Sequence, residues 1–342
     1  MTFDPAERVP IGRTGLSVTR LGFGGASIGG LFSAVADRDA IDVARHAWDI
    51  GVRYFDVAPL YGYGAGERRL GRALADRPRD AYVLSTKVGR VIRAPDAIGP
   101  ETEIDRQALG DREDAYYAGT TDVKVVFDYS ADGVRRSIDE SLERLGLDHI
   151  DLALIHDPDE HWRVAIEQAY PALHRLREAG VVRAIGVGMN QAPMLARFAR
   201  EGDFDAFLVA SRYTLLDQSA LDELLPLAVQ KGTAILAGGV MNTGLLADPR
   251  PGTHYDYRPA PRDVIERAER IGRICARHRV PLKTAAIQFP LAHPAVTSVV
   301  AGVRRIDHLD DYPAAFRARI PPELWEDLRA EGIIAAGAPT PA

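Results

Sequence analysis

Short apolar runs alternate with amphipathic stretches along most of this chain. The apolar runs are nearly continuous, as in strands that are buried on both faces of a parallel sheet. Between them, apolar residues recur at helical spacing, for example at Ile41, Ala44 and Trp48. After an N-terminal glycine-turn hairpin, the pattern predicts strands at 19–25, 53–58, 81–88, 149–157, 181–188, 204–211, 232–239 and 296–302.

The amphipathic stretches supply a helix after most of these strands. This order of about eight strand–helix units fits a (β/α)8 TIM barrel with an N-terminal hairpin better than an open doubly wound sheet. No low-complexity linker interrupts the series, so residues 1–342 are predicted to form a single domain. The helices are expected near 38–50, 66–76, 131–146, 162–179, 191–200, 219–230, 262–278, 282–292 and 305–318.

Two segments break the regular alternation. Residues 89–129 stand between the third strand and its helix, and residues 247–261 are rich in Pro, Gly and Tyr. Connections of this length in a compact domain are typical of lids and binding loops, or else are partly disordered. We expect both at the C-terminal face of the barrel, where such folds carry their active sites.

Composition narrows the class of protein. With 46% hydrophobic and 26% charged residues, the chain can bury a large core. A net charge of −6 with scattered Lys and Arg argues against a nucleic-acid surface. No apolar run reaches a membrane span, and no signal-peptide pattern opens the chain. The single cysteine, Cys275, lies in a helical pattern and suits a core position in a reducing, cytoplasmic protein. The sequence gives no indication of oligomeric state.

Four predicted strands end in a polar residue: Asp56, Lys87, His156 and Asn190, with Tyr61 shortly after the first. A lysine ammonium beside a phenol favours the phenolate, and a carboxylate holds the lysine in place. A neutral histidine can orient a carbonyl or alcohol oxygen. Taken singly, each side chain also has an ordinary structural explanation. Together they would move a proton on and off a substrate oxygen, leaving electron transfer to a bound cofactor.

Two other classes of function compete with this interpretation. A metal-dependent hydrolase would need ligands from several strand ends, whereas the candidates all lie on one short loop, and no metal is predicted. A non-catalytic nicotinamide-binding subunit could use the same scaffold, because a fold does not fix a function. The candidate metal ligands are His156, Asp157, Asp159 and His161.

The motifs that carry these residues resemble those of the aldo-keto reductase superfamily. The resemblance runs from residue 9 to about residue 320, through "FDVAPLYGYGAGE", "STKVG", "LIHD" and "IGVGMN". It implies a barrel that binds a nicotinamide cofactor across its mouth. Tyr61 would then be the general acid/base, with Lys87 and Asp56 as its tuning pair. His156 would orient the substrate, and Asn190 would hold the nicotinamide carboxamide.

The resemblance also implies further cofactor contacts, and the sequence departs from the family pattern at some of them. Ala210 stands where a Gln is common, with Ser211 as the nearest polar substitute, and Gly238 replaces a stacking Tyr. The loop after the last strand lacks the usual Lys and carries acidic residues, which favours NAD over NADP. The implied cofactor-binding residues are Gly25, Asn190, Ser211, Gly238, Gly239, Met241, Thr243, Gly302, Arg304, Arg305 and His308.

Within the superfamily, "LIHDPD", "GVGMNQ" and "LAGGVMNTGLL" look most like the sugar dehydrogenase branch, which includes D-threo-aldose and L-fucose 1-dehydrogenases. This implies a small-molecule substrate: a cyclic aldose oxidised at C1 to a lactone. Pyridoxal 4-dehydrogenase and general NADPH-dependent aldehyde or ketone reductase activities stay open. The polar stretch 156–161 suits a polyhydroxylated substrate, or simply starts the next helix. Residues expected to line the substrate pocket are Phe32, Phe127, Tyr129 and His156.

Overall fold

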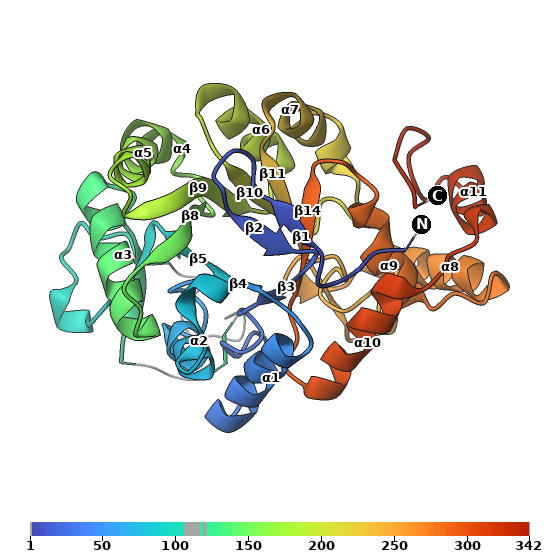
Figure 1. The fold of residues 1–342 in the computed structure, drawn as a ribbon, viewed down its shortest axis with the longest axis horizontal. Coiled ribbons are helices and arrows are strands. Elements are labelled where there is room, and N and C mark those ends of the chain that lie inside the picture. The colour runs from blue at the N-terminus through green and yellow to red at the C-terminus, as the bar shows by residue number, and fades with distance from the viewer. Residues whose placement is uncertain (1, 106–116, 119–121, 342) are drawn as a thin grey trace.

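The computed structural model describes residues 2–105, 117–118 and 122–341. Its centre is a closed barrel of eight parallel strands with helices between them, so the predicted (β/α)8 fold is confirmed (Figure 1). The strands, in their order around the barrel, are β3 (Leu21–Gly24), β4 (Tyr54–Asp56), β5 (Val83–Val88), β8 (Ile150–His156), β9 (Val182–Met189), β10 (Ala206–Ala210), β11 (Ala234–Gly238) and β14 (Val296–Ala301).

The helices surround the barrel, as Figure 1 shows. Their apolar faces pack on the strands, while their polar faces point to solvent. None of the helices in the described part of the chain is long and apolar enough to cross a membrane. They are α1 (Asp37–Asp49), α2 (Ala65–Leu74), α3 (Ala131–Leu145), α4 (Trp162–Val164), α5 (Tyr170–Glu178), α6 (Ala192–Glu201), α7 (Leu224–Lys231), α8 (Arg262–Arg277), α9 (Leu282–Leu291), α10 (Ile306–Arg317) and α11 (Pro322–Ala330).

An antiparallel hairpin of β1 (Arg8–Pro10) and β2 (Ser17–Thr19) lies across the near end of the barrel in Figure 1. Ile11 and Val18 from this hairpin pack into a buried cluster with Tyr54, the first residue of β4. The hairpin therefore closes the N-terminal end of the barrel. The C-terminal ends of the strands, which carry the predicted site, lie at the opposite end.

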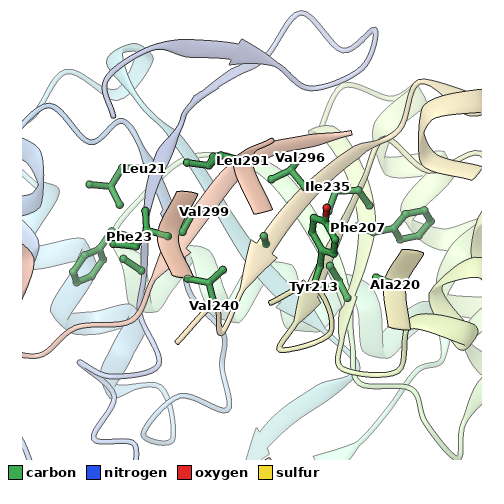
Figure 2. Packing of buried hydrophobic residues seen from close by; sticks show 14 of the residues in the cluster. Leu21, Phe23, Phe207, Tyr213, Ala220, Ile235, Val240, Leu291, Val296 and Val299 are labelled. Carbon is green, nitrogen blue, oxygen red and sulfur yellow. The ribbon is translucent and has the colours of Figure 1, made fainter. Parts of the chain in front are cut away.

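The larger core lies between the barrel and its helices. Leu21 and Phe23 of β3, Val299 of β14 and Ile235 of β11 all pack into this core, together with Leu291 of α9 (Figure 2). Strand residues alternate between this outer layer and the barrel interior. Because both layers are apolar, the strands read as continuous apolar runs, which is why the sequence located them within two or three residues at each end.

Some helices differ from the predicted pattern. The helix expected at 162–179 contains a π-helical turn, Ala165–Ala169, between α4 and α5. Pro171 follows this turn, lacks an N–H group and would clash with the carbonyl four residues earlier in a regular α-helix. The helix expected at 219–230 is a short 3₁₀ turn followed by α7. Helix α11 was not predicted, although it buries Trp325.

Both irregular segments contain a small antiparallel hairpin. The first is formed by β6 (Arg90–Arg93) and β7 (Lys124–Phe127), and the second by β12 (His254–Tyr255) and β13 (Arg258–Pro259). Residues of both hairpins line the same cavity at the barrel mouth. Their location therefore matches the binding loops that the sequence led us to expect.

Candidate functional site

A buried ion pair joins the ends of β4 and β5. Lys87 Nζ donates to Asp56 Oδ2 at 2.7 Å, to Asp56 Oδ1 at 2.9 Å and to the Val57 carbonyl at 3.0 Å. Ser85 Oγ donates to Asp56 Oδ1 at 2.7 Å. Both charged side chains are almost fully buried. The carboxylate is therefore held by several donors, and the ammonium is fixed at the barrel mouth.

Tyr61 lies on the loop that follows β4, with its ring centroid 4.7 Å from Lys87 Nζ. Burial raises the pKa of the Tyr61 phenol well above its ordinary value, and the negative charge of Asp56 raises it further. The sequence led us to expect that the net shift would lower this pKa, and the net shift has the opposite direction. Because the lysine charge is compensated by Asp56, it does not outweigh desolvation.

His156 ends β8 and packs edge-to-face against Tyr61, with ring centroids 5.8 Å apart. Burial lowers the pKa of His156 well below its usual value, and the positive charges of Arg90 and Lys87 lower it further. The imidazole is therefore neutral, as the sequence led us to expect. Its Nδ1 is buried and has no hydrogen-bond partner among the described residues. A neutral ring beside a phenol can orient a substrate oxygen.

These side chains meet at a cavity of about 1160 Å³ in the mouth of the barrel. Tyr61, Lys87, His156 and Asn190 all line it, although they come from segments up to 129 positions apart. The structure thus brings Tyr61 together with the polar residues that follow three of the predicted strands. Asp56 supports them from below through Lys87.

The loops after β10 and β11 could hold a nicotinamide carboxamide. Asn190 Nδ2 donates to the Ala210 carbonyl at 3.2 Å, and Asn242 Nδ2 lies 3.4 Å from the Ser211 carbonyl as a donor. The Asn242 Oδ1 atom is buried without a partner in the described part of the chain. An unpaired buried acceptor beside Ser211 fits a ligand that brings an N–H donor. The sequence did not identify Asn242.

Glycines let these two loops approach each other closely. At Gly239, which has a φ of 61°, a Cβ atom would lie 2.4 Å from Ser211 Oγ. Ser211 itself has a φ of 62°, and Thr243 a φ of 60°. At Gly238 a Cβ would lie 3.2 Å from Leu208, which lines the cavity. An apolar side chain thus borders the position where the family pattern places a stacking ring.

The remaining cofactor candidates lie at neighbouring strand ends. Met241 is half-buried in the turn after β11. The Gly25 amide donates to the Asp56 carbonyl at 2.7 Å, which ties β3 to β4. Gly302 follows β14, and a Cβ there would lie 3.2 Å from Ser27 Oγ. These positions border the barrel mouth without lining the cavity described above.

The basic residues after β14 are engaged by neighbours. Arg304 donates to Ser33 Oγ and to the Leu31 carbonyl at 3.4 Å. Arg305 pairs with Asp307 at 2.6 Å, and this contact lowers the pKa of Asp307 to about 2. The carbonyl of His308 accepts a hydrogen bond from a lysine at 3.0 Å.

The predicted substrate residues divide into two groups. Phe127 lines the cavity, whereas Tyr129 is buried and donates its hydroxyl to the His156 carbonyl at 2.6 Å. Phe32 stacks on His254 of the second hairpin, with centroids 4.5 Å apart, and is not a cavity-lining side chain. Tyr129 and Phe32 therefore support the wall of the cavity.

Several polar residues that line the cavity were not predicted from the sequence. Arg90, at the start of β6, is buried and forms ion pairs with Asp105 at 3.2 Å and with Asp157 at 3.4 Å. Arg212 pairs with Asp256 through two contacts of 2.9 Å. A charged residue three positions after Lys87 in an otherwise apolar run was the available signal for Arg90. Among the described residues, no group of three or more His, Cys, Asp or Glu side chains is arranged to hold a metal.

Comparison with known proteins agrees with this geometry. The Aldo/keto reductase family profile matches residues 20–331. The chain is 43% identical to a D-threo-aldose 1-dehydrogenase from Pseudomonas sp, over 96% of this chain and 97% of the relative. It is 41% identical to a pyridoxal 4-dehydrogenase from Microbacterium luteolum, over 98% and 100%.

A solved structure shows the same fold. The holo form of an aldo-keto reductase from Bacillus halodurans superimposes with a TM-score of 0.73 at 23% identity, covering 97% of this chain and 98% of that one. The matched family profile spans nearly all of the barrel, and the two relatives cover almost the whole chain. This chain therefore belongs to the aldo/keto reductase family and is an oxidoreductase that works with a nicotinamide cofactor.

Proposed function

We propose that this enzyme oxidises an aldose at C1 to the corresponding lactone, with NAD+ as the acceptor. The observation that carries the proposal is the convergence of Tyr61, Lys87 and His156 on one cavity. The extent of identity to a D-threo-aldose 1-dehydrogenase supports the same substrate class, of the D-threo-aldose or L-fucose type.

The proposed chemistry uses the side chains in distinct roles. The Tyr61 phenolate takes the proton of the C1 hydroxyl, and the electron pair of that O–H bond forms the new C=O bond. The C1–H bond breaks at the same time, and a bound nicotinamide supplies the acceptor for its electron pair as hydride. Lys87 stabilises the phenolate, and neutral His156 orients the C1 oxygen. Because burial raises the pKa of Tyr61, oxidation is favoured at alkaline pH.

The proposed preference for NAD over NADP rests on the charges near the last strand. A 2′-phosphate needs free basic groups, and Arg is well suited to bind one. Arg305 is paired with Asp307, and Lys283 is paired with Asp311 at 3.1 Å. Recruiting either cation would break an existing ion pair, which favours the cofactor without the phosphate.

Pyridoxal is a second candidate substrate, favoured by the 41% identity to a pyridoxal 4-dehydrogenase. Its aldehyde and neighbouring hydroxymethyl group can close to a cyclic hemiacetal, which resembles the C1 centre of an aldose. The two candidates differ in what surrounds that carbon. An aldose carries hydroxyl groups, whereas pyridoxal carries an aromatic ring. The charged residues Arg90, Asp157 and Arg212 in the cavity lining favour the polyhydroxylated substrate.

The test is the initial rate with NAD+ and with NADP+ against a panel of aldoses and pyridoxal, followed through reduced nicotinamide. We expect NAD+-dependent turnover of one stereochemical group of aldoses. Turnover of pyridoxal alone would favour the second candidate. If no hemiacetal is oxidised while NADPH drives the reduction of simple aldehydes, the proposal is overturned in favour of a general carbonyl reductase.

We also propose that residues 1–342 work as one domain and act in the cytoplasm. Cys275 suits a reducing compartment, because it is the single cysteine of the chain and cannot form an intrachain disulfide. It is buried in α8, and burial raises its pKa to about 12. A thiol of that kind is inert and serves packing.

A further inference from the structure

We propose that Asp157 accepts a hydrogen bond from a substrate hydroxyl one carbon away from the reacting carbon, so that the cavity selects hydroxylated substrates. The inference deepens the proposed function and rests on its assignment of the cavity as the catalytic site. It also names Arg90 as the residue that positions the Asp157 carboxylate.

Asp157 directly follows His156 and lines the same cavity. Its Oδ2 atom lies 3.4 Å from His156 Nε2 and 3.4 Å from Arg90 Nη2. The closest contacts of Arg90 and of His156 with Asp157 both involve Oδ2, and Oδ1 makes no hydrogen bond to any residue that the structure describes. The side chain is 25% exposed, so this oxygen is accessible within a largely enclosed site. A carboxylate oxygen without a partner, beside the group that orients the reacting oxygen, is suited to bind a neighbouring hydroxyl.

The backbone at Asp157 is fixed in an uncommon conformation. Its φ is 40°, in the left-handed region that few residues other than glycine, Asn and Asp adopt. The Asp157 amide donates to the Gly188 carbonyl at 3.0 Å, and Tyr129 donates its hydroxyl to the Asp157 carbonyl at 3.0 Å. These contacts from β9 and from the segment after β7 hold the residue in place. The position of the carboxylate is therefore built into the fold rather than left to a mobile loop.

Arg90 compensates the charge that this arrangement buries. Its side chain is only 6% exposed, and it forms ion pairs with Asp105 and Asp157 while lying 5.4 Å from the ring centroid of Phe127. A buried carboxylate without a cation would be strongly disfavoured. The closest contact of Arg90 is to Oδ2, which leaves Oδ1 able to accept a hydrogen bond from a ligand. It therefore acts on the substrate through Asp157.

The arrangement predicts selectivity through the cost of an unsatisfied group. A substrate with a hydroxyl next to the reacting carbon donates a charge-assisted hydrogen bond to Asp157 Oδ1 in place of solvent. A substrate without it leaves that oxygen desolvated and unpaired. A hydrogen bond to a charged group is worth enough to discriminate between two such substrates by about 10- to 100-fold in kcat/KM.

The experiment compares glyceraldehyde with propanal, which has the same carbon chain without hydroxyls, as substrates for reduction by NADH. The variants are Asp157→Asn, which tolerates the positive φ and keeps a neutral acceptor, and Asp157→Gly, which tolerates it and removes the side chain. Glu143→Gln is the matched control, because it removes the same charge from an exposed residue of α3 that does not line the cavity.

We expect the wild-type enzyme to prefer glyceraldehyde by about tenfold or more in kcat/KM. The preference should fall in Asp157→Asn and nearly vanish in Asp157→Gly, mainly because kcat/KM with glyceraldehyde falls. The rate with propanal should change by less than about threefold. Glu143→Gln should keep the wild-type preference.

Variants of Arg90 test the positioning role. Arg90→Met leaves Asp105 and Asp157 without their cation and should lower the glyceraldehyde preference. Arg90→Lys keeps the charge and should restore part of it, mainly in the KM for glyceraldehyde. If Arg90 had a purely structural role, Arg90→Met would lower kcat/KM equally for glyceraldehyde and propanal. Arg90→Lys would then not restore the preference for glyceraldehyde.

Equal losses for both aldehydes in the Asp157 variants, an unchanged preference, or no wild-type turnover of glyceraldehyde would overturn the inference. The result is separable from the proposed function. If aldoses are not oxidised but glyceraldehyde is still preferred through Asp157, the inference stands and the aldose assignment falls. If aldoses are oxidised but Asp157→Gly keeps the preference for glyceraldehyde, the aldose assignment stands and the inference about Asp157 falls.

Discussion

The two faces of β5 carry buried ion networks of similar composition and different surroundings. On the inner face, Lys87 pairs with Asp56 at the barrel mouth, with Ser85 as a further donor. On the outer face, Thr86 donates to Glu67 Oε1 at 2.7 Å, and Arg144 pairs with Glu67 Oε2 at 2.5 Å. Successive strand residues point to opposite faces. The adjacent residues Thr86 and Lys87 therefore belong to two separate networks.

The surroundings decide what each network does. Lys87 lines the cavity and lies beside the Tyr61 ring, so its charge acts on a group that can meet a substrate. Glu67 is fully buried between α2 and α3, and Arg144 is 14% exposed. That pair joins two helices and has no access to the cavity. Buried charge pairs are weak evidence for function by themselves, and contact with the cavity is the distinguishing feature.

Removing the phenol hydroxyl of Tyr61 should lower catalytic activity more than any other change at the inner network. Tyr61→Phe loses the group that takes the proton while keeping the ring and its packing. We expect kcat for aldose oxidation to fall by about 10³-fold, within the range of general acid–base catalysis. Cofactor binding, followed by protein fluorescence, should stay within about twofold. A near-normal rate in this variant would contradict the proton-transfer role.

Removing the lysine should alter both rate and pH dependence. In Lys87→Met, the charge of Asp56 is no longer compensated, so the already raised pKa of Tyr61 should rise further. Oxidation needs the phenolate, and the alkaline rise of kcat should therefore move to higher pH, with kcat lowered by about 100-fold near neutrality. The measurement is the pH–rate profile. An unchanged profile would speak against coupling between Lys87 and Tyr61.

The matched change on the outer face should affect stability alone. Arg144→Met leaves Glu67 buried without its cation, and breaking such a pair costs about 3–5 kcal/mol in the free energy of unfolding. The folded fraction should keep kcat within about twofold of the wild type. Urea unfolding and steady-state rates on the same preparation check both parts. A large loss of kcat in the folded variant would show that the two networks are coupled.

Acidification should weaken the selectivity assigned to Asp157. Burial raises the pKa of Asp157 to about 6, with Asp159 and Asp105 raising it while Arg90 and Lys87 lower it. The carboxylate is thus ionised above that value and protonated below it. The ratio of glyceraldehyde to propanal kcat/KM should therefore decline between pH 7 and pH 5. It should stay flat in Asp157→Asn, and a decline there would assign the titration to another group.

The smallest effect is expected at Tyr129. Its single hydroxyl proton is shared between the carbonyls of His156 and Asp157, so Tyr129→Phe removes a bifurcated hydrogen bond that holds the backbone of the site. Such a bond contributes about 1 kcal/mol. We expect kcat/KM with an aldose to fall by about 3- to 10-fold, and the unfolding midpoint in urea to fall slightly. An unchanged kcat/KM would show that the site does not depend on this support.

The sequence could predict the barrel and the residues at its strand ends for one reason. Strands buried on both faces are apolar throughout, so a polar residue such as Lys87 or His156 at the end of one is conspicuous. Helix α11 and the π turn before Pro171 were missed, because short amphipathic patterns do not fix how a helix ends or bends.

Networks that join distant segments could not be predicted. Glu67 reads as an ordinary polar residue in the first turn of a helix, and its partner Arg144 lies 77 positions away. Arg90, Asp105 and Asp157 likewise meet only in three dimensions. The sequence also led to the wrong direction for the Tyr61 pKa shift, because burial depends on the whole fold and not on the motif.

The most direct test of hydride transfer from C1 of the aldose follows a deuterium label at that carbon. An aldose labelled with deuterium at C1 is incubated with NAD+ and the wild-type enzyme, and both products are analysed by NMR. We expect deuterium to appear on the reduced cofactor, the sugar product to be the lactone, and Tyr61→Phe to form neither. Retention of deuterium in the sugar product would contradict hydride transfer from C1 and, with it, the assigned reaction.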